Sequence, residues 1–421
     1  MNISETQSSA VRPARARRQS RPVYLPFDVP LVLVTILLLI FGLLILYSAS
    51  TDYSIRVLGQ DADYIFLNQL RSLVIALGVA GVMMFMDYHY WRRLVVPGIL
   101  VILLALLAVL VFGDNRLGST RTFFQGSYMP SEPAKIITIL YLSVWLYSKR
   151  NYLGQVSFGL LPLAGIIGLI SGFILLQPDL SAAATIVMLG GLLFFLAGGD
   201  LRQIALLLVV TVIVGWLVVQ IHPTGNERFA SYRDSIQDPT LASYHVQRSL
   251  SAFISGGFFG RGLGLGGAKY TGLPLPPTDS IFAVVAQETG LLGSSFMILL
   301  YAVLVWRGLV IAFKAPDMLG SLIAGGLSLW LALEAFMNMA VMVNLLPFAG
   351  NALPFVSSGG SNLVVSMMAI GILMNVSRLS NKQPEEQKGS AQNATVGVRG
   401  RDGRGRVSRT RRTASTRRKR R

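Results

Sequence analysis

Long runs of apolar residues, separated by short polar segments, make up most of the chain. The first run covers residues 29–47, and the others centre on 70–86, 94–113, 132–148, 157–176, 180–198, 203–221, 290–313, 319–346 and 361–378. A helix needs about 20 apolar residues to cross the core of a bilayer, and most of these runs approach that length. The first run is also too long for the apolar part of a cleaved signal peptide. The pattern predicts an all-α, polytopic membrane protein with ten transmembrane helices.

The composition agrees with a membrane protein and removes several other classes. Hydrophobic residues make up 52% of the chain and charged residues 14%, whereas soluble proteins carry about 25% charged residues. Because the chain has no cysteine, disulfides, thiolate catalysis and cysteine metal sites are excluded. His89, His222 and His245 show no ligand spacing, so we do not expect a histidine metal site.

Positive charge is concentrated at the two ends of the chain. Residues 382–421 hold 14 basic and 3 acidic residues, and residues 1–28 hold five Arg against two acidic residues. We predict a disordered basic arm at 1–28, a membrane domain at 29–380 and a disordered basic tail at 381–421. Such ends can set the topology, bind anionic lipid or bind a cytoplasmic partner; we do not expect nucleic acid as a partner.

The Lys and Arg residues of the short loops set the expected orientation. Both termini in the cytoplasm place Arg92, Lys149 and Arg307 on the inner side, as the positive-inside rule requires. The segment 222–279 then forms one large extracytoplasmic loop, with an interfacial helix near 242–254 followed by a glycine-dense stretch. Several Arg residues also fall outside against the usual bias, which indicates an anionic ligand on that face.

Ionisable residues within or beside the apolar runs are the main candidates for chemistry, because burying them in a membrane is costly. Glu132 and Lys135 lie three residues apart, on one face of a helix, where they can pair. They could be a capping carboxylate and a lysine that reaches the surface. Alternatively, Lys135 faces a cavity and binds a diphosphate. Glu288 and Glu334 are further candidates of this kind.

Two aspartates stand at the outer ends of predicted spans. Asp179 follows Gln177-Pro178 in a tight turn, and Asp279 follows a proline-rich segment. Either carboxylate could simply cap the next helix. A carboxylate fixed at the boundary between lipid and water is also well placed to act as a base on a lipid-linked substrate.

A series of short motifs runs in order through residues 30–380. The motifs are Leu46-Tyr-Ser-Ala-Ser50, Gly118-x-x-Arg121, Pro130-Ser-Glu-x-x-Lys135, Gln177-Pro-Asp179, Arg228-Phe229, Tyr244-x-x-Gln247, Ser255-Gly-Gly257, Gly260-x-Gly262-Leu-Gly264, Leu275-Pro-x-Thr278-Asp279, Glu288-x-Gly290, Asn338, Leu346-Pro347 and Leu353-Pro-Phe-Val-Ser357-x-Gly-Gly-Ser361. With this ordered set the chain resembles the SEDS family (shape, elongation, division and sporulation), which includes the RodA and FtsW cell-wall proteins. The chain departs from the family's usual residues at Thr122, Met129, Gln287, Glu334 and Ser358.

The resemblance implies a peptidoglycan glycosyltransferase that polymerises lipid II, a disaccharide-pentapeptide on undecaprenyl diphosphate, and releases undecaprenyl diphosphate. Asp279 is then the catalytic base. The implied substrate-binding residues are Arg121, Glu132, Lys135, Asp179, Arg228, Gln247, Lys269, Ser357 and Ser361. The cations would hold the diphosphate, and the carboxylates would orient those cations or hold a divalent ion, Mg²⁺ or Mn²⁺.

The resemblance also implies a place and partners. We expect the cytoplasmic membrane of a bacterium, a class B penicillin-binding protein as partner transpeptidase, and other proteins of the division or elongation machinery. The long tails favour the FtsW-like branch. A lipid II flippase would also be compatible with ten helices that carry embedded charge, but the motif residues gather on the outer face, which favours an enzyme. An interaction scaffold for the division machinery would explain the tails but not Lys135 or Asp179.

Overall fold

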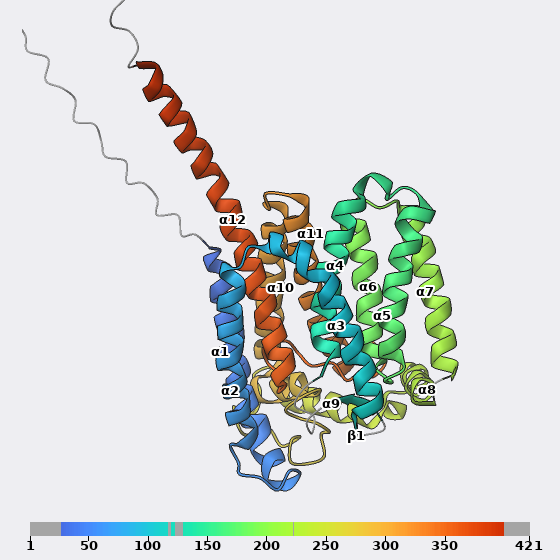
Figure 1. The fold of residues 1–421 in the computed structure, drawn as a ribbon. Helices are drawn as coiled ribbons and strands as arrows, with labels where there is room; N and C mark the ends of the chain where they lie inside the picture. The colour runs from blue at the N-terminus through green and yellow to red at the C-terminus, as the bar shows by residue number, and fades with distance from the viewer. Residues whose placement is uncertain (1–26, 117–118, 123–128, 222, 400–421) are drawn as a thin grey trace, which may run out of the picture.

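The protein is a bundle of long helices, described by a computed structural model over residues 27–116, 119–122, 129–221 and 223–399 (Figure 1). The α-helices are α1 (Val29–Arg56), α2 (Tyr64–Phe85), α3 (Trp91–Phe112), α4 (Ser131–Lys149), α5 (Leu161–Leu175), α6 (Leu180–Leu196), α7 (Leu201–Ile221), α8 (Pro223–Gln237), α9 (Tyr244–Gly256), α10 (Ile281–Phe313), α11 (Met318–Met342) and α12 (Gly360–Arg399). Short 3₁₀ or π turns occupy Tyr88–Tyr90, Arg150–Tyr152, Val156–Leu160 and Pro239–Leu241. A two-stranded antiparallel hairpin joins β1 (Asp114–Arg116) to β2 (Ser119–Thr122).

Eight of the described helices are long and apolar enough to cross a membrane, which confirms the prediction of a helical, multi-pass membrane protein. They are α1, α2, α3, α5, α7, α10, α11 and α12, some with the short turn before them. Two further helices, α4 and α6, pack against α11 in the same bundle. The polar first turn of α4 and the 17-residue length of α6 set them apart from the eight. The count of ten spans stays a prediction.

The two ends of the bundle differ in character. The chain enters α1 and leaves through α12 at one end, whereas α8, α9 and the hairpin lie at the opposite end (Figure 1). The segment predicted as one large loop, 222–279, thus contains two helices. α9 overlaps the predicted interfacial helix at 242–254. α8 was not predicted, because its sequence is mostly polar and lies in a segment interpreted as a loop.

The helix α10 begins earlier than the apolar pattern predicts and is broken at Gly290. There φ is +68°, a left-handed conformation that glycine adopts without strain. The backbone groups freed by the break bond to the segment Ser255–Gly267, which we call the glycine segment. The bonds are Arg261 N–H to Gln287 O (3.0 Å), Gly262 N–H to Glu288 O (3.0 Å), Leu291 N–H to Gly257 O (3.0 Å) and Leu292 N–H to Phe258 O (3.2 Å).

Only glycine fits where these two pieces of chain meet. A Cβ at Gly260 would lie 2.2 Å from the carbonyl oxygen of Glu288, and one at Gly290 would lie 2.3 Å from the nitrogen of Gly260. The glycine segment therefore splints a broken helix, because buried backbone groups in a membrane protein must find partners. The splint fixes the direction of residues 281–289, the half of α10 that follows Asp279.

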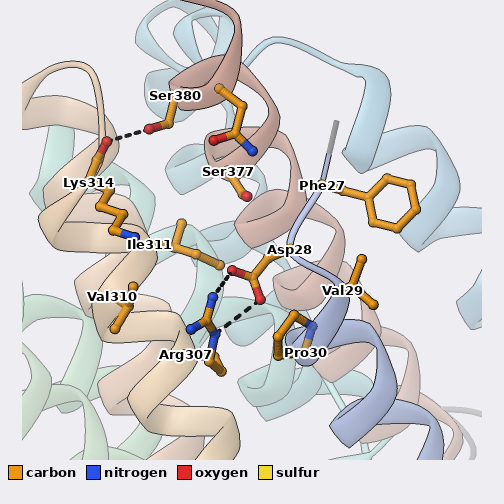
Figure 2. Close-up of a pocket in the computed structure, with 11 residues that line it drawn as sticks. Phe27, Asp28, Val29, Pro30, Arg307, Val310, Ile311, Lys314, Ser377 and Ser380 are labelled. Atoms are coloured by element: carbon orange, nitrogen blue, oxygen red, sulfur yellow. Dashed lines mark hydrogen bonds and ion pairs between the residues drawn. The ribbon is translucent and has the colours of Figure 1, made fainter. Parts of the chain in front are cut away.

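The end of the bundle where the chain enters and leaves holds a pocket of about 360 Å³ between α1, α10 and α12 (Figure 2). Asp28 and Arg307 form an ion pair across it. Asp28 also caps α1 by accepting a hydrogen bond from Leu31 N–H at 3.0 Å. Asp28 is thus part of the bundle, although we expected it to end the disordered arm.

The C-terminal end also differs from the expected division of the chain. α12 continues as a helix to Arg399, so the tail boundary predicted at residue 381 falls inside it. Residues 385–388, Glu-Glu-Gln-Lys, are good helix formers and allow the helix to continue past the apolar run. The remaining residues of both ends lie outside the described residues.

Candidate active site

A cavity of about 230 Å³ lies at the end of the bundle that carries α8 and α9. It is bordered by α4, α6, α11 and α12 and by the segments before α10 and α12. Residues far apart in sequence meet here, and they include five of the predicted site residues. Its ionisable and hydroxyl side chains are Glu132, Lys135, Asp179, Asp279, Glu334, Ser181, Thr278, Ser358 and Ser361.

Lys135 is the cation of this cavity among the described lining residues. Its side chain is only 4% exposed, and Nζ lies 2.9 Å from Glu132 Oε1 and 2.7 Å from Glu334 Oε1. The lysine therefore points into the bundle and does not reach for the surface. A buried ammonium is tolerable only with such partners, because desolvation of an unpaired charge is costly.

Glu132 is fixed by a second contact. Its Oε2 accepts a hydrogen bond from Asn362 Nδ2 at 3.1 Å, which joins the start of α4 to the start of α12. Ser361, the neighbour of Asn362, lines the cavity and accepts a hydrogen bond from Met129 N–H at 3.2 Å. The beginnings of the two helices are thus held together at the cavity's edge.

Asp279 lines the same cavity from a loop. The N-cap of α10 is Ser280, so Asp279 lies one residue before the helix cap. Asn338 on α11 donates hydrogen bonds from Nδ2 to the carbonyl of Asp279 at 2.9 Å and to that of Asn351 at 2.6 Å. This one amide anchors the two segments that approach the cavity from opposite sides.

The segments around Asp279 are strained and tightly bound to each other. Leu275 and Phe355 have left-handed φ values of +48° and +68°, which cost energy for residues other than glycine. Ser357 Oγ donates to the carbonyl of Thr278 at 2.6 Å and accepts from Leu353 N–H at 2.8 Å. Ser357, predicted to bind substrate, thus supports the loop that carries Asp279.

Asp179 fits both interpretations of its role. Its Oδ1 accepts hydrogen bonds from Ala182 N–H at 3.1 Å and Ser181 Oγ at 2.9 Å, so it caps α6. Asp179 also lines the cavity, although it is almost fully buried. Capping therefore does not remove this carboxylate from the site.

Besides Ser357, four predicted site residues are not among the described residues that line the cavity. Lys269 is buried in an ion pair with Glu288 at 2.8 Å, and Gln247 bonds to the carbonyls of Thr240 and Ala242 within its own loop. The guanidinium of Arg228 on α8 lies 5.5 Å from the ring centre of Phe348. Arg121 lies on β2, and its side chain lies outside what the structure describes.

His245 on α9 stacks on the ring of Phe348, the same ring that lies near Arg228. Its ring centre lies 4.2 Å from that of Phe348. Burial, and then the nearby charge of Arg228, lower the pKa of His245 to about 4. The imidazole is therefore neutral at ordinary pH and can act as a packing group between α9 and the segment that follows α11.

Several polar residues of the site were missed by the sequence interpretation. Gln69 on α2 donates to the carbonyl of Ser357 at 3.2 Å and accepts from Gly359 N–H at 3.2 Å. Asn351 and Asn362 also have supporting roles that we did not predict. A buried amide in an apolar run is itself a signal, since polar groups within a membrane need partners.

A divalent ion such as Mg²⁺ would need several oxygen ligands close together. Four carboxylates line the cavity. Even so, no group of three or more His, Cys, Asp or Glu side chains converges closely enough for a metal anywhere in the described residues. These described residues do not by themselves form a site for Mg²⁺ or Mn²⁺.

A sequence profile of the FtsW/RodA/SpoVE family, described as cell cycle protein, matches residues 29–382. The chain belongs to this family. Stage V sporulation protein E of Bacillus subtilis is 34% identical over 362 residues, which cover 84% of this chain and 97% of that protein. A protein of Trichlorobacter lovleyi named probable peptidoglycan glycosyltransferase FtsW is 36% identical, covering 83% of this chain and 93% of its own.

Solved structures of the family have the same fold. A structure described as showing the coordination of polymerization and crosslinking by a peptidoglycan synthase complex superposes with a TM-score of 0.71. It is 24% identical and covers 85% of this chain and 99% of that one. The rod shape determining protein RodA of Thermus thermophilus has a TM-score of 0.62 at 23% identity, covering 85% and 98% of the two chains. The SEDS resemblance drawn from the motifs is thus confirmed.

Proposed function

We propose that this protein polymerises lipid II into glycan strands at the outer face of the cytoplasmic membrane of a bacterium. Peptidoglycan glycosyltransferase is the activity that its curated relatives are named for, and the enzyme class expected from the motifs is confirmed on that ground. A lipid II flippase is not favoured. The substrate, the residues and the orientation are our proposals.

The observation that carries the proposal is the meeting of Asp279 and Lys135 in one cavity. In the reaction, the 4-hydroxyl oxygen of the acceptor GlcNAc bonds to the anomeric carbon of the lipid-linked MurNAc, with inversion. The bond from that carbon to the diphosphate oxygen breaks, and the electron pair leaves with undecaprenyl diphosphate. Asp279 takes the proton of the attacking hydroxyl, a role in which a positioned carboxylate contributes roughly 10²–10⁴-fold.

The other residues hold the substrate or the site. Lys135 balances the charge of the leaving diphosphate, while Glu132, Asp179 and Ser361 fix the groups around it. Arg121 and Arg228 lie on β2 and α8, at the same end of the bundle as the cavity, and we propose that they contact the phosphates or sugars of a bound substrate. Lys269, Gln247 and Ser357 support the outer segments.

The proposal includes an orientation in the membrane. The end that carries the cavity faces outward, and both termini lie in the cytoplasm. Because the native chain has no cysteine, a single cysteine at the exposed Gln237 reports the side of α8. Labelling of that cysteine in intact cells is expected; labelling only after permeabilisation would reverse the orientation.

We propose a class B penicillin-binding protein as the transpeptidase partner, with other proteins of the division or elongation machinery. A similar structure belongs to a synthase complex in which polymerization and crosslinking are coordinated. The long tails and the FtsW relatives favour the division branch.

The direct test is glycan synthesis by the purified full-length protein supplied with labelled lipid II, with and without its cognate transpeptidase. Glycan ladders on a gel are expected. Transport of lipid II across vesicles without any polymer under either condition would support the flippase instead.

A further inference from the structure

The buried ammonium of Lys135 lies between two carboxylates that belong to different helices. Glu132 on α4 is 2.9 Å away, and Glu334 on α11 is 2.7 Å away. One ammonium therefore contacts two carboxylates, and when all three groups are ionised the trio carries an excess of negative charge. A single carboxylate would already satisfy the lysine's charge.

The two carboxylates occupy different levels of the cavity. Glu132 stands in the first turn of α4, at the outer edge. Glu334 lies one helical turn along α11 from Asn338, on the side away from the Asp279 loop, and only 1% of its side chain is exposed. Its Oε1 also accepts a hydrogen bond from Trp330 Nε1 at 3.2 Å. Glu334 thus forms the floor of the cavity and holds the ammonium from below.

This arrangement works against binding of an anion. The described lining residues contribute four carboxylates, those of Glu132, Asp179, Asp279 and Glu334, against one ammonium. A diphosphate can bind Lys135 only if the ammonium gives up contact with one of its two carboxylates. The flexible stem of a lysine permits such an exchange.

We propose that Glu334 is a positioning residue that sets the affinity of the cavity for diphosphate by competing for Lys135. When a diphosphate binds, the ammonium of Lys135 leaves Glu334 and contacts the phosphate. When the product leaves, the ammonium returns to Glu334. Glu334 thereby weakens retention of undecaprenyl diphosphate after each transfer. This inference rests on the proposed function, in which the donor's leaving group is a diphosphate.

The test uses Glu334→Gln in the purified full-length protein. The amide keeps the size of the side chain and can accept hydrogen bonds from Lys135 and Trp330, but it has no charge. We expect inorganic pyrophosphate to bind about tenfold more tightly or better, since a unit charge next to the ligand is removed. KM for lipid II should fall by a similar factor, and kcat should fall because product release slows.

Glu288→Gln is the matched control. It neutralises a carboxylate that is equally buried and also pairs with a lysine, Lys269, at 2.8 Å. Glu288 does not line the cavity among its described residues. Pyrophosphate binding should therefore stay within about twofold of wild type.

Unchanged or weaker pyrophosphate binding by the folded Glu334→Gln protein would overturn the inference, because Glu334 would then support Lys135 in its binding position. If that variant unfolds, Glu334→Asp moves the charge away from the ammonium and should give a smaller gain in affinity; no gain overturns the inference. Pyrophosphate binding needs no lipid II. Tighter pyrophosphate binding by Glu334→Gln, with no glycan synthesis by the wild-type protein, would reject the polymerase alone. Glycan synthesis by wild type, with unchanged pyrophosphate binding by the variant, would reject only the role of Glu334.

Discussion

Gly350 has no side chain at the point where the carboxylate of Asp279 needs room. A Cβ on Gly350 would lie 2.9 Å from Asp279 Oδ2. The glycine comes from the segment between α11 and α12, which Asn338 anchors together with the Asp279 loop. The absence of a Cβ at Gly350 therefore leaves room for the direction in which the proposed base points.

Replacing Gly350 by Ala should reduce activity much more than stability. The atom it meets is the end of a short side chain, so the Asp279 carboxylate can rotate away at little cost to folding. A displacement of about 1 Å at a reacting group can cost about 10²-fold in rate, and we expect a loss of at least about tenfold in kcat for glycan synthesis.

Gly78→Ala on α2 is the control for Gly350→Ala, because a Cβ at Gly78 meets nothing within 4 Å. It should leave both the rate and the thermal unfolding midpoint close to wild type. Full activity of a folded Gly350→Ala protein would show that the carboxylate does not need this direction.

Gly260→Ala should destabilise the contact between the glycine segment and α10. The new Cβ would lie 2.2 Å from the carbonyl oxygen of Glu288, at a residue whose φ is +81°. Both the clash and the strain act on the splint across the break in α10, so we expect a loss of about 2 kcal/mol or more in unfolding free energy.

Gly267→Ala tests the same segment at a position with open space, since a Cβ on Gly267 would meet nothing within 4 Å. Thermal unfolding in detergent should separate the two variants clearly. Equal midpoints for Gly260→Ala and Gly267→Ala would contradict the splint.

The pKa of His245 predicts a loss of stability on the acid side. The folded pKa is about 4, below the ordinary value of 6.5. Between these values the unfolded chain binds more protons than the folded protein, so stability falls as the pH drops from about 7 toward 4. His245→Phe keeps a ring against Phe348 and cannot titrate.

The measurement for His245 is the change in unfolding midpoint between about pH 7.5 and pH 5, a window in which the unfolded histidine takes up its proton, for wild type and His245→Phe. The variant should lose less stability over this interval. An identical loss in both proteins would show that His245 contributes nothing to the acid sensitivity.

The spans could be predicted because apolar runs of membrane length have one main interpretation. The break in α10 at Gly290 could not be predicted in the same way. Gly290 interrupts the helix, and backbone bonds to the glycine segment bridge the break. Such long-range backbone pairing leaves no periodic signal in the sequence.

The motifs identified several residues of the cavity, but the sequence did not reveal how their side chains contact one another. Glu132, Lys135, Asp179 and Asp279 meet as the motifs suggested. Lys269 shares the motif-rich outer loop but turns inward to Glu288, because the direction of a side chain in a glycine-dense segment depends on packing. The contact between Glu334 and Lys135 joins helices far apart in the sequence and became visible only in the fold.

The central claim is that Asp279 is the catalytic base, and Asp279→Asn tests it most directly. The amide keeps the size of the carboxylate and most of its hydrogen bonding, but it cannot take a proton at useful pH. Asp317→Asn is the matched control, since Asp317 caps α11 by accepting from Gly320 N–H, and Asn caps a helix about as well as Asp. Glycan synthesis from lipid II by folded protein should fall roughly 10²–10⁴-fold in Asp279→Asn and stay near wild type in Asp317→Asn. Glycan chains of near-normal yield from folded Asp279→Asn protein would contradict the account.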